Sequence, residues 1–433
     1  MEDNTFVLVI ESLSYGGRGV GRRSDGKVVF VPAALPGETV LVSVVKQHPS
    51  FINARIVEVL KPSPLRQSPR CRTFDKCGGC DWQHMPYEYQ VKWKQDILLG
   101  EISKINKLIP EEVQPPVESI ETYGYRRTAR IQCKYINGQP VLGFFMKRSH
   151  RIVSFEECPV LAGPLQVAFD GLRCALERHP LPSLVSFDMQ APKDEVLISA
   201  RLKGNISKDL EKSMYEIFMD TDVPGMSFTV LGDKRRDYVF GQRYLGYTVD
   251  VNGKVFEMVT GFGSFMQANH YVNTEMIGYV ALLAGGAGNN KILDLYSGGG
   301  NFSIPLASLG NKITAIDRNS RLVAQGKRSA RLNDIYSAKF ICMDSLKAVK
   351  QMASESITFD TVILDPPREG ARDVSGFIPG LDAERIVYVS CNPLTLGRDL
   401  SILISNGYRF KSLKLFDMFP HSYHIESIAF LQR

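Results

Sequence analysis

Cys391 is the residue whose position first suggests chemistry, because it directly follows a stretch that should form a buried strand. The run 386–389 is apolar and rich in β-branched residues, as in strands covered on both faces, and Asn392-Pro393 is a turn signal that ends it. Ligands of open α/β sheets bind at the carboxyl ends of the strands, where this thiol is expected to lie. The alternative is a structural role, since free cysteine is among the most frequently buried residue types.

A glycine-rich turn upstream predicts a nucleoside-binding site. In KILDLYSGGGNF (291–302), a strand is predicted to end at Asp294, and the glycines at 298–300 let the backbone approach a ligand before the next helix. A second predicted strand ends at Asp317, placed to bond ribose hydroxyls, and a third ends at Asp344, placed to meet an adenine edge. Nicotinamide dinucleotides and S-adenosylmethionine both suit such a site. Because the G-x-G-x-x-G pattern is missing, S-adenosylmethionine is favoured, with a purely structural turn as the alternative.

A fourth predicted strand, in FDTVILDPPREG (359–370), ends in a turn at the same sheet edge. Pro366 and Pro367 fix the turn and lack N–H donors, so the Asp365 carboxylate is expected to face the crevice between substrate and cofactor. A plain turn is the weaker interpretation after two matched strands upstream.

Glu426 is a candidate general base for the same site. It stands two residues after His424, on one face of an extended segment that leads into an apolar terminal strand. A single glutamate near a terminus is usually solvated. One that shares a sheet edge with a thiol and a cofactor can instead move a proton.

Four other cysteines have the spacing of a metal-binding set. Cys71, Cys77 and Cys80 follow the pattern C-x5-C-x2-C, and Cys158 is the candidate for a distant fourth ligand. Four thiolates bind zinc or a 4Fe-4S cluster, and spacing alone does not separate the two. Disulfides are not expected, because the cytosol keeps thiols reduced. The remaining cysteines besides Cys391 are expected in the core: Cys133, Cys174 and Cys342.

The elements that must position these residues suggest three domains in a chain of 433 residues. Short strand-like runs broken by glycine and proline predict a barrel of the oligonucleotide-binding type at 1–62. Residues 63–255 are expected to form a central α+β domain, in which the part from about 118 to 255 holds strands, turns and one helix at 207–220. Alternating strands and helices over 256–433 predict a doubly wound, Rossmann-like α/β domain, on which a helix at 87–109 is expected to pack.

Composition indicates a cytosolic protein. The chain is 44% hydrophobic and 23% charged, and no apolar run approaches the length of a membrane span, so no membrane partner is expected. No obligate protein partner is evident from the sequence. The net charge of +6 says little by itself. Residues 123–135 and 144–153, however, interleave Lys and Arg with aromatic residues, which suits phosphates and stacked bases unless these are ordinary solvated strand faces.

Five short motifs, taken in order, carry a family resemblance. GSFMQANH, DLYSGGGNF, DPPREG, SCNP and HIES run through the last ~175 residues in the order found in the RNA 5-methyluridine methyltransferase family, which this chain therefore resembles. The N-terminal barrel is similar to a TRAM domain, an RNA-binding module of many members. The sequence CRTFDKCGGC, with Cys158, resembles the family's ligand set for an iron–sulfur cluster, which favours 4Fe-4S over zinc.

The resemblance implies roles for individual residues. Cys391 would be the nucleophile and Glu426 the base. The residues implied to line the S-adenosylmethionine site are Gln267, Tyr296, Asn301, Asp317, Asp344 and Asp365. Members commonly have Cys where this chain has Ser297, and Glu where it has Asp317, which shortens the reach to the ribose by one methylene.

The implied reaction explains why a thiol and a base are needed together. Carbon 5 of uracil is a poor nucleophile, but thiolate addition at carbon 6 creates an enolate whose carbon 5 can accept a methyl group. A base must then remove the proton from carbon 5, and the uridine must leave its stack to reach the thiol. The implied partner is structured RNA, with 23S ribosomal RNA favoured and the T-loop of transfer RNA as the alternative. An RNA-binding protein without activity, or a methyltransferase for protein or small molecules, are the competing interpretations.

Overall fold

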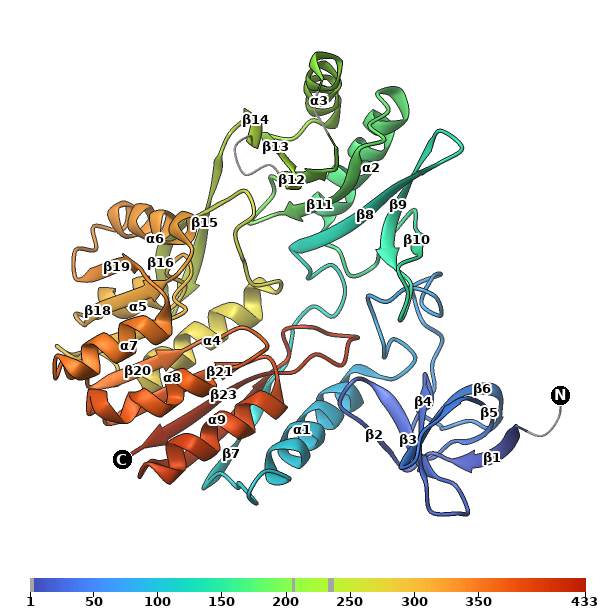
Figure 1. The fold of residues 1–433 in the computed structure, drawn as a ribbon, viewed down its shortest axis with the longest axis horizontal. Helices are drawn as coiled ribbons and strands as arrows, with labels where there is room; N and C mark the ends of the chain where they lie inside the picture. Colours follow the sequence, from blue (N-terminus) through green and yellow to red (C-terminus); the bar gives the residue numbers. More distant parts are fainter. Residues whose placement is uncertain (1–3, 205–206, 233–236) are drawn as a thin grey trace.

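Three large sheets and one hairpin organise the chain (Figure 1). The computed structural model describes residues 4–204, 207–232 and 237–433. In Figure 1 the N-terminal barrel (blue) lies at the lower right, the central sheet (green) at the top, and the C-terminal unit (yellow to red) on the left. The mixed α/β core and the N-terminal β module confirm the predicted fold class.

The first six strands form the N-terminal barrel, in the order β1-β5-β6-β4-β3-β2. They are β1 Thr5–Val9, β2 Ser12–Leu13, β3 Arg18–Arg22, β4 Val28–Pro32, β5 Thr39–Gln47 and β6 Phe51–Lys61. Because β1 also contacts β3, the sheet curls around a small aliphatic core that includes Val29, Val40 and Ile52. Gly21 makes this curl possible, since a Cβ there would lie 2.2 Å from the backbone oxygen of Val9.

The central sheet has the order β10-β9-β8-β11-β12-β13-β14, and helices α2 and α3 pack against it. Its elements are β8 Thr128–Ile136, β9 Gln139–Phe145, β10 Ile152–Ser154, α2 Gly163–Arg178, β11 Leu184–Gln190, β12 Leu197–Leu202, α3 Lys208–Thr221, β13 Gly225–Val230 and β14 Asp237–Gly241. The expectation of a single helix here is wrong. The α2 segment contains Pro164 and Gly171, which weaken a helix prediction, but Pro164 lies in the first turn, where proline is tolerated.

The C-terminal sheet has eight strands, in the order β19-β18-β17-β20-β21-β23-β22-β7. Its strands are β17 Lys291–Leu295, β18 Lys312–Asp317, β19 Ala338–Cys342, β20 Thr361–Leu364, β21 Arg385–Ser390, β22 Arg409–Phe416, β23 Glu426–Gln432 and β7 Glu112–Val117. All pairings are parallel except those of β23, which runs antiparallel to β21 and β22. The start of β23 therefore lies at the same edge as the ends of its neighbours.

Helices cover both faces of this sheet, as a doubly wound fold requires. One face carries α4 His270–Leu283, α5 Ser303–Ser308 and α6 Ser320–Leu332, together with the hairpin of β15 Tyr244–Val251 and β16 Lys254–Gly261. The other carries α1 Tyr87–Ser103, α7 Ser345–Ser354, α8 Arg372–Phe377, the 3-10 turn Ile378–Leu381 and α9 Pro393–Ser405. No helix among the described residues is both long and apolar enough to cross a membrane.

Two strand ends differ from the prediction. β17 continues to Leu295, so Asp294 lies inside the strand and is fully buried. β19 ends at Cys342, and Asp344 instead caps the N-terminus of α7, where its carboxylate accepts a hydrogen bond from the backbone N–H of Lys347. A polar residue after an apolar run can end a strand or begin a helix, and the sequence pattern does not separate the two.

A buried ion pair anchors the loop that precedes β23. Lys94 of α1 donates hydrogen bonds to the carboxylate of Asp417 (2.5 Å) and to the backbone oxygen of Phe419 (2.8 Å). The side chains of Lys94 and Asp417 are fully buried. The next carbonyl groups of the loop accept from the Tyr125 hydroxyl and from backbone N–H groups of the segment after the cysteines. The irregular loop is thus held in place by hydrogen bonds that other segments donate to its carbonyl groups.

Removing the cation should leave a buried, unpaired carboxylate. We expect Lys94→Met to lower the free energy of unfolding in urea by about 3–5 kcal/mol, because the charge of Asp417 stays in the interior without a partner. Lys411→Met is the control, since Lys411 pairs with Glu111 at the surface and should cost less than about 1 kcal/mol. Equal losses in the two variants would show that the buried pair does not anchor the loop.

Candidate active site

Cys391 and Glu426 lie next to each other at the carboxyl edge of the large sheet. In the antiparallel pairing of β21 with β23, Ser390 lies opposite Ser427. One residue further along each strand, the chain brings the thiol and the carboxyl group together. The thiol is half-buried, whereas Glu426 is buried.

Burial and mutual charge favour the neutral forms of both groups. Burial, and after it the charge of Glu426, raises the pKa of Cys391 to about 12, while Arg368 acts in the opposite direction. Burial, followed by the charge of Asp365, raises the pKa of Glu426 well above its usual value. The thiol therefore needs its proton removed before it can attack, and Glu426 is a stronger base once ionised.

The turn after β20 supplies the cation beside these groups. An Nη atom of Arg368 lies 3.5 Å from Nδ1 of His424, and the backbone oxygen of Arg368 accepts a hydrogen bond from the Asn392 side chain. Burial and then Arg368 lower the pKa of His424 to about 3, so its imidazole is neutral. The turn is thus tied to the start of α9, and Arg368 is the free cation of this cluster among the residues that the structure describes.

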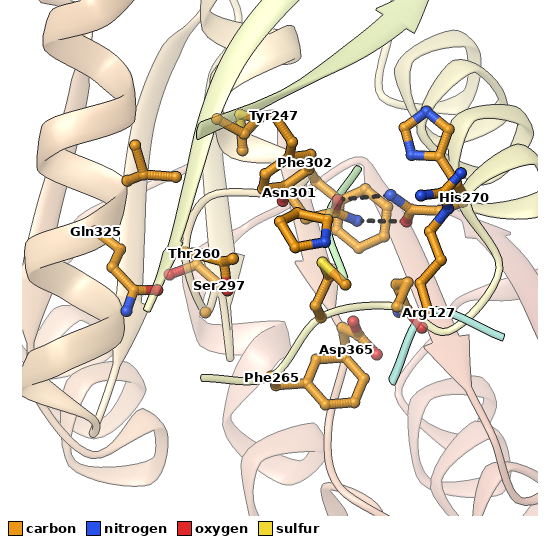
Figure 2. A pocket seen from close by; sticks show the side chains of 18 of the residues that line it. Arg127, Tyr247, Thr260, Phe265, His270, Ser297, Asn301, Phe302, Gln325 and Asp365 are labelled. Atoms are coloured by element: carbon orange, nitrogen blue, oxygen red, sulfur yellow. Dashed lines mark hydrogen bonds between the residues drawn. The ribbon is translucent and has the colours of Figure 1, made fainter. Parts of the chain in front are cut away.

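A cavity lies beside Asp365, between the loop after β17 and the segment before α4 (Figure 2). The cavity encloses about 80 Å³ and is open to solvent at its mouth. Four of the residues predicted for the cofactor line it, namely Gln267, Tyr296, Asn301 and Asp365. The hydroxyl groups of Thr260 and Ser297 are buried in its wall, and neither has a hydrogen-bond partner within the described part of the chain. A polar ligand in the cavity would satisfy such groups.

The glycine-rich loop takes the strained path that lets it border this cavity. Tyr296 has a φ of 62°, Gly298 of 55° and Gly300 of 90°, which is the left-handed region. At Gly300 a Cβ would also meet the ring of Phe340 at 2.9 Å. The loop is closed by Asn301, whose side-chain amide exchanges two hydrogen bonds with that of Asn273 (2.9 and 3.0 Å), drawn as dashed lines in Figure 2.

The structure places the other two predicted cofactor residues outside the cavity lining. One carboxylate oxygen of Asp317 accepts from the backbone N–H of Gly298 (3.0 Å) and the other from that of Asn319 (2.7 Å). Asp344 caps α7. Its charge, after burial, raises the pKa of Tyr296 to about 12. Both acids therefore contact the loop outside the cavity lining. Asp317 accepts hydrogen bonds from the loop backbone, and Asp344 lies near the Tyr296 side chain.

Two carboxyl groups stand under the site, that of Asp294 fully buried and that of Asp365 half-buried. Burial, opposed by a hydrogen bond from Ser303, raises the pKa of Asp294 to about 7, and burial together with Asp294 raises the pKa of Asp365 to about 7. Both groups are therefore partly neutral near pH 7. A cationic ligand beside Asp365 would favour its carboxylate form.

Several cavity residues were not anticipated from the sequence. They are Arg127, Tyr247, Thr260, His270, Asn273 and Gln325, which come from strands, loops and helices far apart along the chain. Asn273 could have been noticed in the sequence, because it is a buried amide on the otherwise apolar inner face of α4. Arg127 belongs to the first basic and aromatic segment, and its guanidinium donates to the backbone oxygen of Lys193 (3.0 Å).

The four predicted ligand cysteines line one small cavity between the segment 71–83 and the central domain, together with Arg126 and the rings of Phe144 and Phe155. Burial raises the pKa of Cys77, Cys80 and Cys158, and their charges influence one another. Among the described residues no three side chains of the ligand types form a group that could hold a metal ion. Of the other cysteines, Cys133 is buried as expected, whereas Cys174 and Cys342 are exposed, so the core assignment of these two is wrong.

A groove on the surface leads toward the catalytic edge. It lies between the barrel, the cysteine segment and the turn of β9 with β10, and it measures about 1360 Å³ with its open side. Basic residues line it, namely Arg18, Lys147, Arg148 and His150, and Tyr423 of the catalytic loop lies at its end. This places the second basic and aromatic segment opposite the barrel, on a surface that suits a polyanion.

The doubly wound sheet, the glycine-rich loop and the polar cavity at the carboxyl edge define the class of S-adenosylmethionine-dependent methyltransferases. The family model described as tRNA (Uracil-5-)-methyltransferase matches residues 185–433, and the TRAM domain model matches residues 4–57. The chain belongs to the family of RNA (uracil-C5) methyltransferases, and it carries an N-terminal TRAM domain.

Similar proteins cover almost the whole chain. One is the 23S rRNA (uracil(1939)-C(5))-methyltransferase RlmD of Alcanivorax borkumensis, 34% identical over 98% of this chain and 96% of that protein. The protein of the same name from Pseudomonas entomophila is 32% identical over 98% of this chain and 93% of its own length. The solved structure of Pyrococcus abyssi tRNA (uracil-54, C5)-methyltransferase in complex with S-adenosyl-L-homocysteine has a TM-score of 0.74 and 24% identity, with 98% of this chain and 100% of that chain covered. The similarity to this solved structure shows that the two chains share a fold.

The raised pKa of the half-buried Asp365 carboxyl predicts a pH-dependent effect on stability. Its folded-state pKa of about 7 exceeds the ordinary 3.8, so its neutral form favours folding below pH 3.8 and that contribution is lost as the pH rises to about 7. Asp365→Asn should therefore stabilise the cofactor-free protein by on the order of 2–4 kcal/mol at pH 8 and by much less at pH 5. Urea unfolding at both pH values measures this. Asp194→Asn, at an exposed position, is the control, and a gain independent of pH would contradict the assignment.

Proposed function

We propose that this protein transfers a methyl group from S-adenosylmethionine to carbon 5 of a uridine in 23S ribosomal RNA, with Cys391 as nucleophile and Glu426 as base. The observation that carries the chemistry is the pairing of β21 with β23, which brings a thiol and a carboxyl group together beside Asp365. The ribosomal substrate rests on relatives of that name at 32–34% identity. A transfer RNA uridine is the alternative, and we place the reaction in the cytoplasm.

The residues of the cavity suit S-adenosylmethionine, which when bound supplies a methyl group on a positively charged sulfur. Asp365 offers a carboxylate to that charge, and the free hydroxyl groups of Thr260 and Ser297 offer hydrogen bonds. Gln267, Tyr296 and Asn301 add polar groups to the lining. We assign two further contacts from the outer side of the loop, Asp317 for the ribose and Asp344 for the adenine, as the family resemblance implies.

The residues at the sheet edge are assigned to the bond changes on the uracil, which begin from the thiolate form of Cys391. The Cys391 sulfur adds to carbon 6 of the uracil, and the π electrons move toward the carbonyl at carbon 4. Carbon 5 then takes the methyl group, the methyl–sulfur bond would break to leave a neutral thioether, and the carboxylate of Glu426 removes the proton from carbon 5. The electrons of that C–H bond restore the double bond and expel the thiolate. Arg368 favours the thiolate over the thiol, since its charge lowers the pKa of Cys391.

RNA binding is supported by the TRAM domain and by the basic groove that leads to Tyr423. Phosphate groups bind to such surfaces mainly through charge, so affinity should fall as salt rises. The target uridine has to be turned out of its stack to reach Cys391, because the thiol is half-buried at the edge of a sheet.

We further propose that Cys71, Cys77, Cys80 and Cys158 hold a 4Fe-4S cluster. Their thiols surround one cavity, and the nearby Arg126 suits the negative charge of four thiolates. The choice of a 4Fe-4S cluster over a zinc ion rests on the family resemblance, because four thiolates can bind either. Such a cluster would link the segment after the barrel to the central sheet.

The substrate is tested with labelled S-adenosylmethionine and RNA from a strain that lacks this gene. We expect 5-methyluridine in the digest of 23S ribosomal RNA and none in transfer RNA. Label in transfer RNA alone would show that transfer RNA, the alternative, is the substrate. Absence of label from both would overturn the methyl-transfer proposal.

The two catalytic roles are separated by two variants and one trapping reagent. Cys391→Ala should lose more than about 10⁴-fold in turnover and form no adduct with 5-fluorouridine RNA, while cofactor binding persists. Glu426→Gln should accumulate a methylated covalent complex, because addition proceeds and proton removal fails. Denaturing gels and mass spectrometry detect these species. Free methylated RNA from either variant at wild-type rates would contradict its assigned role.

Iron content tests the cysteine proposal independently of activity. Protein purified without oxygen should be brown and contain about four irons per chain, and Cys80→Ala should lose both properties. Cys342→Ala is the matched control, since that thiol is exposed and lies away from the cavity. Colourless protein that contains one zinc ion per chain would contradict the cluster and indicate a single-ion site instead.

A further inference from the structure

One loop of the barrel contacts the loop that precedes β23. The loop between β2 and β3 carries Tyr15, and its neighbour Gly17 is packed so closely that a Cβ there would lie 3.1 Å from Cβ of Tyr423. The backbone oxygen of Gly17 also accepts a hydrogen bond from the indole of Trp82 (3.1 Å). The tip of this loop is therefore fixed against the segment that ends in Glu426.

The ring of Tyr15 lies edge-on to the ring of Tyr423, with 5.8 Å between centroids. Tyr423 in turn contacts His424, at 4.6 Å between ring centroids. Both tyrosines pack against the apolar core that lies under the sheet edge, so their position is set by the barrel and the methyltransferase domain together. Tyr15 is only partly buried, so part of the residue stays accessible to solvent.

The Tyr15 hydroxyl lies among the groups that are proposed to carry out the reaction. Burial, followed by the charges of Tyr423 and Cys391, raises the pKa of Tyr15 to about 12, while Arg368 lowers it and Glu426 raises it. The phenol is therefore protonated at neutral pH and able to donate a hydrogen bond. The groups that influence it include both proposed catalytic residues.

From this placement we infer that Tyr15 of the barrel contacts the target uracil and donates a hydrogen bond to one of its carbonyl oxygens. The inference rests on the proposed function. Negative charge moves onto the ring carbonyl when the Cys391 sulfur adds to carbon 6, and a fixed neutral donor stabilises such charge. The TRAM domain is then part of the active site, and it completes the pocket of a base delivered by the RNA.

The inference predicts a specific pattern of kinetic loss. Tyr15→Phe keeps the ring and its packing on Tyr423 but removes the donor. We expect kcat for methyl transfer and the rate of adduct formation with 5-fluorouridine RNA to fall about 10- to 100-fold. The KM for RNA and the affinity for S-adenosylmethionine should change less than about threefold, because the barrel surface and the cofactor cavity are intact.

Tyr336→Phe is the matched control, since Tyr336 is 84% exposed on the loop between α6 and β19. It should behave as wild type, and the thermal midpoint of both variants should match that of wild type. A loss in Tyr15→Phe confined to KM would make Tyr15 an RNA-docking side chain and overturn the inference. Wild-type kinetics in Tyr15→Phe would overturn it as well, with the proposed function intact. If wild type and control form no 5-methyluridine, the proposed function and the inference both fall.

Discussion

The buried ion pair between Lys94 and Asp417 is the interaction on which the catalytic edge depends. The loop between β22 and β23 is irregular and buried, so each of its carbonyl groups needs a donor from elsewhere. Lys94 comes from α1, Tyr125 from the segment before the central sheet, and Trp82 from the segment after the cysteines. Three stretches of chain thus hold one loop, and that loop ends at Glu426.

Burial and crowding at this edge favour the neutral forms of its acidic groups. Cys391, Glu426 and Asp365 are crowded at one edge with Arg368 as the nearby cation, and burial raises the pKa of all three. Ionising all of them at once is costly in such a site. A bound cationic ligand and a bound uracil would change this balance, so the charged forms are favoured when the reactants are present.

Local motifs in the sequence predicted much of the site, because each motif follows a strand of recognisable pattern. Cys391 and Asp365 come directly after β21 and β20, and parallel strands bring their ends to one edge. Helix α2 was missed, since its stability comes from burial against the sheet, which local propensity does not contain. Tyr15 was missed too, because nothing near residue 15 indicates that this loop reaches a site about 400 residues further along the chain.

The sequence by itself determined the class of fold, the reaction family, and the residue types available for chemistry. Their signals are local: strand patterns, a glycine-rich turn, a proline-fixed turn and paired cysteine spacings. The tertiary structure decided which residues meet. It turned Asp344 into a helix cap, placed Asp317 behind the glycine loop, and brought Tyr15 beside Tyr423. These outcomes depend on packing between distant segments, and the free energy of such contacts is not encoded in any one stretch of chain.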